Sequence, residues 1–72
     1  MPNALTEISD FDGDGTVYRF FASVAGSQPE LVIEADSGQH VTRLTLGSAD
    51  LGNFAHHAEQ ARKKLLRLWV AR

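Results

Sequence analysis

Residues 30–46 read ELVIEADSGQHVTRLTL and contain the clearest secondary-structure pattern of the chain. Two runs, Glu30–Asp36 and His40–Leu46, alternate apolar and polar side chains, and the turn formers Asp36-Ser37-Gly38-Gln39 separate them. Such a pattern is typical of an antiparallel hairpin, because parallel pairing needs a crossover of about a dozen residues. We therefore predict two strands with one apolar and one polar face. The apolar members are Leu31, Ile33, Ala35, Leu44 and Leu46, and the polar members are Glu30, Glu34, Asp36, Arg43 and Thr45.

A third alternating run, Thr16–Ala25, precedes this hairpin and is bounded by glycine-rich turns. It places Tyr18, Phe20, Ala22 and Val24 on one face and Arg19 and Ser23 on the other. Residues 4–9 contain Leu5 and Ile8 and can add a short first strand, although the alternation fails there. The sequence thus predicts a three-stranded, or with residues 4–9 a four-stranded, antiparallel β-meander.

After Ser48 the apolar period changes from two residues to three and four, which predicts one long helix over residues 50–71. We expect an α+β domain spanning residues 1–72, with this helix packed on one face of the sheet. The apolar stripe of the helix consists of Leu51, Phe54, Ala55, Ala58, Ala61, Leu65, Leu68 and Trp69. The predicted core combines much of that stripe with sheet residues, namely Tyr18 or Phe21, Phe20, Val24, Leu31, Ile33, Leu44, Leu46, Leu51, Phe54, Ala58, Ala61, Leu65 and Leu68.

The small size of the chain suggests that a partner chain stabilises it. A domain of 72 residues without cysteine buries only about 60% of its unfolded surface and has no disulfide to stabilise it. The last turns of the helix add an apolar surplus at Leu65, Leu66, Leu68, Trp69 and Val70. We therefore expect a homodimer with Leu65, Leu68 and Trp69 at the interface; the alternative is that the stripe only covers its own sheet.

Charge is distributed unevenly along the chain. Residues 1–50 carry eight acids and two bases, whereas residues 51–72 carry one acid and five bases, within a net charge of −2. The acidic strand residues Glu30, Glu34 and Asp36 suggest docking on a basic protein surface. In composition the chain resembles small phage and plasmid proteins that block host machinery, so we expect a non-enzymatic regulatory or inhibitory protein that docks on another protein. The alternative is a nucleic-acid-binding dimer whose helix presents the basic ridge Arg62, Lys63, Lys64 and Arg67.

Other chemistry has weaker signals. Asp10, Asp12 and Asp14 followed by Gly15 resemble the first half of an EF-hand loop, but the position of its closing glutamate is Phe21. We expect a mobile, solvated turn over Asp10–Gly15, with no bound metal and no cofactor. No serine and histidine spacing indicates a nucleophile. Since no apolar run approaches the roughly 18 residues of a membrane span, we expect a cytoplasmic chain without membrane contact.

Overall fold

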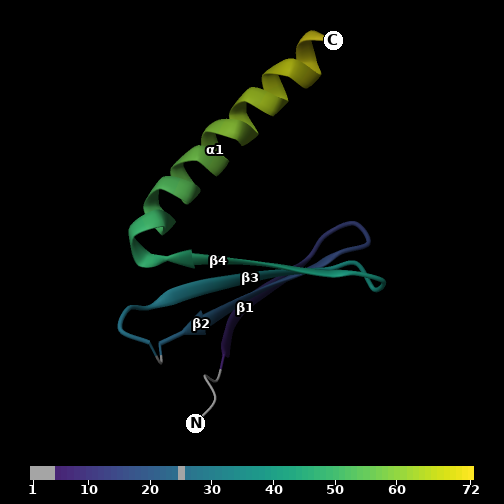
Figure 1. Ribbon diagram of the computed structural model, residues 1–72. Helices are drawn as coiled ribbons and strands as arrows, with labels where there is room; N and C mark the ends of the chain where they lie inside the picture. The colour runs from purple at the N-terminus through teal and green to yellow at the C-terminus, as the bar shows by residue number, and fades with distance from the viewer. Residues whose placement is uncertain (1–4, 25) are drawn as a thin grey trace.

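The computed structural model describes residues 5–24 and 26–72, which form a four-stranded sheet followed by one helix (Figure 1). The sheet order is β1-β2-β3-β4, and each neighbouring pair is antiparallel. The α+β meander with a C-terminal helix is therefore confirmed. The elements are β1 (Thr6–Asp12), β2 (Val17–Ser23), β3 (Glu30–Asp36), β4 (Val41–Gly47) and α1 (Ser48–Ala71).

The first strand is longer than the sequence suggested. β1 runs to Asp12, and its pairing with β2 shifts between Glu7 and Ser9, which leaves Ile8 in a β-bulge. Asp10 and Asp12 are strand residues opposite Arg19 and Val17, so the expectation of a turn beginning at Asp10 is wrong. The alternation failed there because a bulge breaks the period of two. The predicted starting residue of this strand, residue 4, and the predicted end of the next, Ala25, lie outside the described residues.

The strand register divides the sheet into two faces, because cross-strand partners point to the same side. Phe20, Ile33 and Leu44 are neighbours on one face, and Phe11 stacks on Tyr18 there with 4.9 Å between ring centroids. Phe21 pairs with Val32 on the other side, so Tyr18 and not Phe21 belongs to the apolar set. We call this side the apolar face: Phe11, Tyr18, Phe20, Ala22, Leu31, Ile33, Ala35, Leu44 and Leu46. The opposite side is the charged face, whose ionisable members are Glu7, Asp10, Asp12, Arg19, Glu30, Glu34, Asp36 and Arg43.

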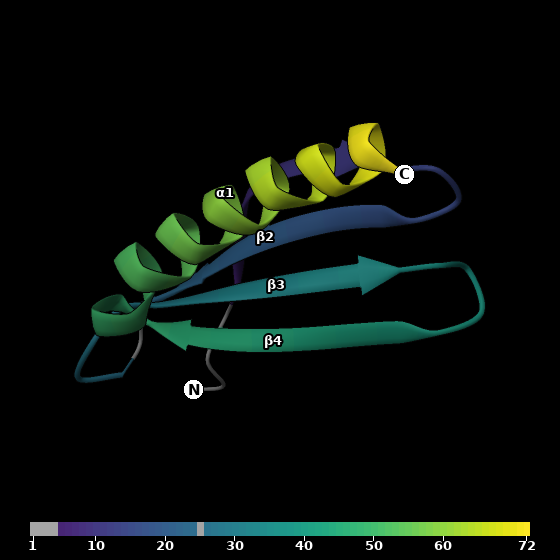
Figure 2. The same ribbon diagram turned by 90° about the horizontal axis from the view of Figure 1, so that it is seen from above.

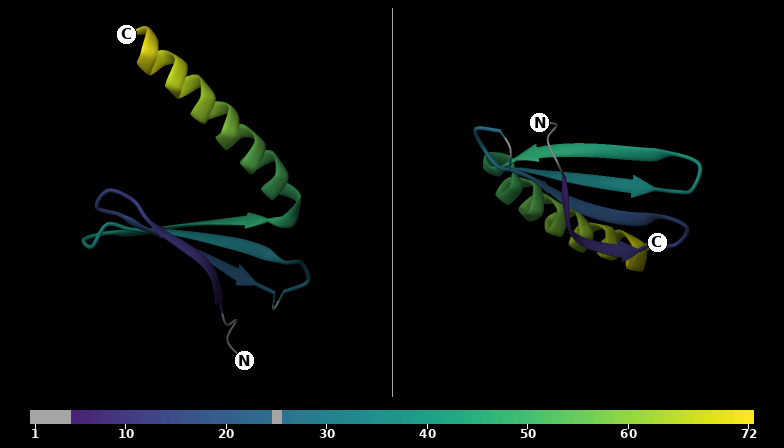
Figure 3. Two further views of the ribbon diagram at one scale, coloured as in Figure 1. Left: turned by 180° about the vertical axis from the view of Figure 1, so that it is seen from behind. Right: turned by 90° about the horizontal axis from the view of Figure 1, so that it is seen from below.

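The helix begins two residues earlier than predicted, at Ser48, directly after the last residue of β4. It does not lie on the sheet, which corrects its predicted placement. Along the chain from residue 52 every helical residue is exposed, and α1 approaches only β3 and β4 among the described elements. Figures 1 and 3 show that α1 points away from the sheet. In the view from above, α1 overlies the strands (Figure 2). The reason is the missing linker: a strand that runs straight into a helix has no loop residues with which to turn the helix back.

The predicted core is consequently wrong within a single chain. Leu65 and Leu68 are 64% and 62% exposed, Leu44 is 45% exposed and Val24 is 73% exposed. Among the described residues the buried hydrophobic residue is Val32, and it lies on the charged face together with buried Ser23 and Glu34. The centre of the sheet is therefore buried on the charged side, whereas on the apolar face Phe11 and Leu44 are exposed and the other members are partly buried.

Candidate functional site

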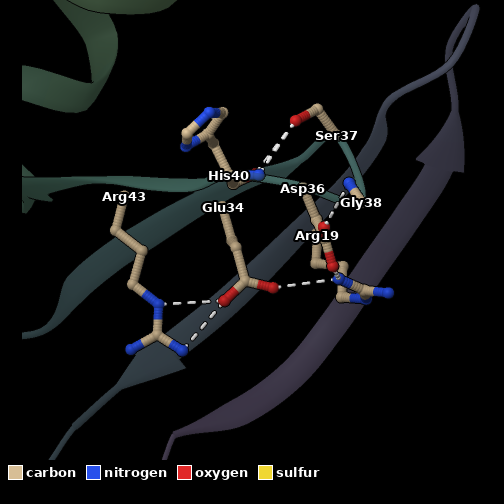
Figure 4. A network of polar contacts seen from close by, with 7 residues as sticks. All are labelled: Arg19, Glu34, Asp36, Ser37, Gly38, His40 and Arg43. Carbon is tan, nitrogen blue, oxygen red and sulfur yellow. Dashed lines mark hydrogen bonds and ion pairs between the residues drawn. The ribbon is translucent and has the colours of Figure 1, made fainter.

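The charged face carries a network of ion pairs across its three C-terminal strands (Figure 4). The carboxylate of Glu34 accepts from Arg19 Nη1 at 3.0 Å through one oxygen. Its other oxygen accepts a hydrogen bond from Arg43 Nε at 2.9 Å and lies 2.8 Å from Arg43 Nη2. Arg19 Nη1 also donates to Asp36 at 3.2 Å. Since the Glu34 side chain is only 9% exposed, this carboxylate is both buried and fully engaged.

These contacts set the ionisation of the two acids. Hydrogen bonds from Arg43 and then from Arg19 hold the pKa of Glu34 below its ordinary value. The backbone N–H of Gly38, 2.9 Å from Asp36 Oδ1, is the largest cause that lowers the pKa of Asp36, and Arg19 adds to it. Both groups are thus ionised and satisfied inside the chain.

This arrangement changes what the acidic strand can offer a partner. Of the three residues that the sequence singled out on β3, Glu34 and Asp36 are bound by arginines of the neighbouring strands, and Glu30 is exposed. Sequence reasoning missed Arg19 and Arg43 as their partners. The signal was present, because both arginines alternate onto the polar side of their strands, but only the register aligns them with Glu34.

Free carboxylates lie instead on the edge strand β1. Glu7, Asp10 and Asp12 are exposed, and no ion pair involves them within residues 5–24 and 26–72. The pKa of Glu7 is raised, chiefly by its interaction with the nearby carboxyl of Asp10, then by desolvation and by the negative charge of Asp10. Two carboxylates therefore crowd each other at this edge of the charged face.

The basic ridge is divided by an internal ion pair. Arg62 Nη2 lies 2.6 Å from Glu59 Oε1 one turn earlier, so the Arg62 guanidinium is engaged within the helix. Lys63, Lys64 and Arg67 are exposed and form no ion pair in the described part of the chain. On a helix these three positions lie within an arc of about 100°, on the side away from Leu65. The ridge is thus three available cations rather than four.

The residues predicted for a dimer interface are exposed in the single chain. Leu65, Leu68 and Trp69 are 64%, 62% and 61% exposed, respectively. The guanidinium of Arg72 lies over the Trp69 ring, 3.4 Å from its centroid, and covers one side of it. The stripe of α1 is therefore an apolar surface without a partner in this chain.

The metal candidates are not gathered into one site. Asp10 and Asp12 are separated along β1, and Asp14 lies in the turn that Gly13 N closes by donating to Thr16 O at 2.6 Å. Among the described residues no three His, Cys, Asp or Glu side chains are placed to hold a metal ion, and no pocket is found there.

The chain matches no family model, no curated protein and no solved structure. Within residues 5–24 and 26–72, no helix is long and apolar enough to cross a lipid bilayer.

Proposed function

We propose that the protein is a non-enzymatic binding module that regulates or inhibits another protein by docking on it, and that the charged face is the docking surface. This face carries six carboxylates and two arginines. Both arginines are already held by Glu34, and one of them also by Asp36. The face therefore presents a surplus of negative charge to a partner.

The observation that carries this proposal is the pair of crowded carboxylates on β1. Asp10 raises the pKa of Glu7, and neither carboxylate forms an ion pair in the described chain. A lysine or arginine of a partner supplies that missing cation. Because charge at an exposed rim mainly governs association rate and partner choice, the partner surface should be basic and its binding should weaken as salt is added.

The edge position of β1 adds to this surface. β1 is hydrogen-bonded on one side only, to β2, so its outer backbone groups are open. The carboxylates that border it discourage pairing with another acidic edge and favour a basic partner. We further propose a cytoplasmic location, which suits a chain that has no cysteine and needs no oxidising compartment.

The test is affinity capture from a lysate with quantitative identification of the proteins retained. The variant carries Glu7→Gln, Asp10→Asn and Asp12→Asn, which remove charge and preserve shape. A matched control carries Lys63→Gln, Lys64→Gln and Arg67→Gln on the helix. A basic partner retained by the wild type and the helix variant, and lost by the β1 variant, supports the proposal. A partner retained equally by all three shows that the charged face is not the docking surface.

A second function is favoured by the free cations of α1. Lys63, Lys64 and Arg67 are exposed and unpaired in the described chain, and with Arg62 they form the ridge expected of a nucleic-acid-binding dimer. Fluorescence anisotropy with labelled single- and double-stranded DNA at two salt concentrations tests it. Affinity that falls steeply with salt in the wild type, and disappears in the helix variant above, supports this function. Absence of binding at low salt rules it out.

A further inference from the structure

The single chain exposes far more surface than a protein of its mass does when compact. Its accessible surface is 5844 Å², whereas a compact monomer of this mass exposes about 4,400 Å². Its radius of gyration is 14.8 Å, against about 11 Å for a compact domain of this length. The surplus, about 1,400 Å² per chain, is surface that a partner can remove from water.

Two apolar surfaces account for the open shape. The apolar face of the sheet has Phe11 and Leu44 exposed at 53% and 45%. The stripe of α1 has Leu65, Leu68 and Trp69 exposed at more than 60%. Helix stripes and sheet faces normally cover one another, but here the direct joint between Gly47 and Ser48 carries the helix away from its own sheet. Each chain thus exposes an apolar sheet face and an apolar helix stripe that do not pack on each other.

We propose that a second copy of this chain occupies both surfaces, with α1 of each copy lying by its stripe on the apolar face of the other copy's sheet. The exchange is reciprocal, so both contacts are equivalent and the assembly closes as a two-fold dimer. Two chains that each lose a surplus of about 1,400 Å² bury about 2,900 Å², which falls within the range of obligate homodimers. The occupant that this area fits is therefore a copy of the chain itself.

Charge supports the same arrangement. Residues 1–50 carry eight acids and two bases, and residues 51–72 carry one acid and five bases. The exchange places the basic helix of one copy over a sheet whose opposite, charged face carries six of these acids, so the attraction acts across the sheet and favours the encounter of the two chains. Lys63, Lys64 and Arg67 lie on the side of the helix away from the stripe, so they stay in water and do not oppose the contact.

Engineered cysteines provide the test, because the chain contains none of its own. Leu44→Cys on the apolar face is mixed with a mass-tagged chain carrying Ala58→Cys, Ala61→Cys or Leu65→Cys on the stripe, one at a time. After mild oxidation we expect a mixed disulfide between the two kinds of chain. The matched control replaces Leu44→Cys by Thr45→Cys, the next residue of β4, which points to the charged face and should give no mixed disulfide.

Mass measured by light scattering over a dilution series completes the experiment. We expect twice 7.9 kDa for the wild type, and a dissociation constant raised about thirtyfold by Trp69→Ala, as for an anchor residue. A monomer mass at every concentration overturns the proposal. So does a dimer in which stripe cysteines link only to each other and none links to Leu44→Cys, because the helices then meet without covering the sheets.

Discussion

Arg19 of β2 and Glu34 of β3 are direct cross-strand partners, and their Nη1 and Oε1 atoms are 3.0 Å apart. The same row of the sheet continues with Asp10 on β1 and Arg43 on β4, so charges of alternating sign cross all four strands. A one-residue slip of any strand moves its member of this row to the apolar face. The row therefore specifies register in a sheet that has little apolar core of its own.

Removing the centre of this row should destabilise the fold. Glu34→Gln keeps the shape of the side chain but leaves Arg19 and Arg43 without their common carboxylate. We expect the melting temperature to fall by several degrees, because the part-buried guanidinium of Arg19 and the exposed one of Arg43 lose their common anion. The control is Glu30→Gln on the same strand and face, where the exposed side chain should give a change near zero. Equal melting temperatures for both variants would show that the network adds no stability.

The free energy of unfolding should fall in acid, because the pKa values of two carboxyl groups are lowered in the folded chain. The pKa of Glu34 lies below its ordinary 4.5 and that of Asp36 below its ordinary 3.8 in the folded chain. The stabilisation from each is complete above the ordinary value and is lost as pH falls through the lowered one. Urea unfolding midpoints at steps below pH 5 measure this loss. In the Glu34→Gln variant the loss should be smaller, and an identical pH profile would contradict the assignment.

Glu7 should act in the opposite direction. Its pKa is raised above 4.5 in the folded chain by Asp10, so its contribution to stability is present at low pH and is lost as pH rises through the raised value. We expect Glu7→Gln to raise the urea midpoint at neutral pH and to leave it unchanged near pH 3. A midpoint that falls at neutral pH would show that the carboxylate makes a favourable contact of its own.

How far the sequence predicts this molecule depends on the range of the interactions involved. Local signals were sufficient for β3, β4 and α1: alternation in Glu30–Asp36, a turn at Gly38, and a three- and four-residue period after Ser48. The bulge at Ile8 weakened the signal of β1, which the sequence offered only as a possible short strand over residues 4–9, because it breaks the alternation by which a strand is identified. The pattern of α1 showed that it has an apolar stripe, but not what the stripe meets.

The candidate site was harder still to predict. Glu34 appeared as a free acid because its two arginines lie nine and fifteen residues away in the chain. Their pairing depends on the register of three strands, and one sequence contains no direct record of that register. The crowding of Glu7 and Asp10 depends likewise on the bulge between them. Composition indicated correctly that the first half of the chain is acidic, but not which carboxylates are free.

Replacement of Gly38 and of Gly52 by alanine should have opposite effects on stability. Gly38, in the turn between β3 and β4, has φ of +89°, a region that alanine adopts at a penalty of about 1–2 kcal/mol. Its N–H also donates to Asp36 Oδ1, so a distorted turn weakens an acid of the charge network. Gly38→Ala should lower the free energy of unfolding by at least that amount.

Gly52 is the matched control, because it lies within α1 and an added Cβ meets nothing within 4 Å. Here alanine removes the conformational freedom of the unfolded glycine and clashes with nothing, so Gly52→Ala should raise the free energy of unfolding by about 0.5–1 kcal/mol. Urea unfolding followed by circular dichroism measures both variants under one set of conditions and at one protein concentration, since dimerisation adds to apparent stability. A stabilised Gly38→Ala would show that the β3–β4 turn relaxes to negative φ, and a destabilised Gly52→Ala would show that a neighbouring molecule occupies the space beside the first turns of α1.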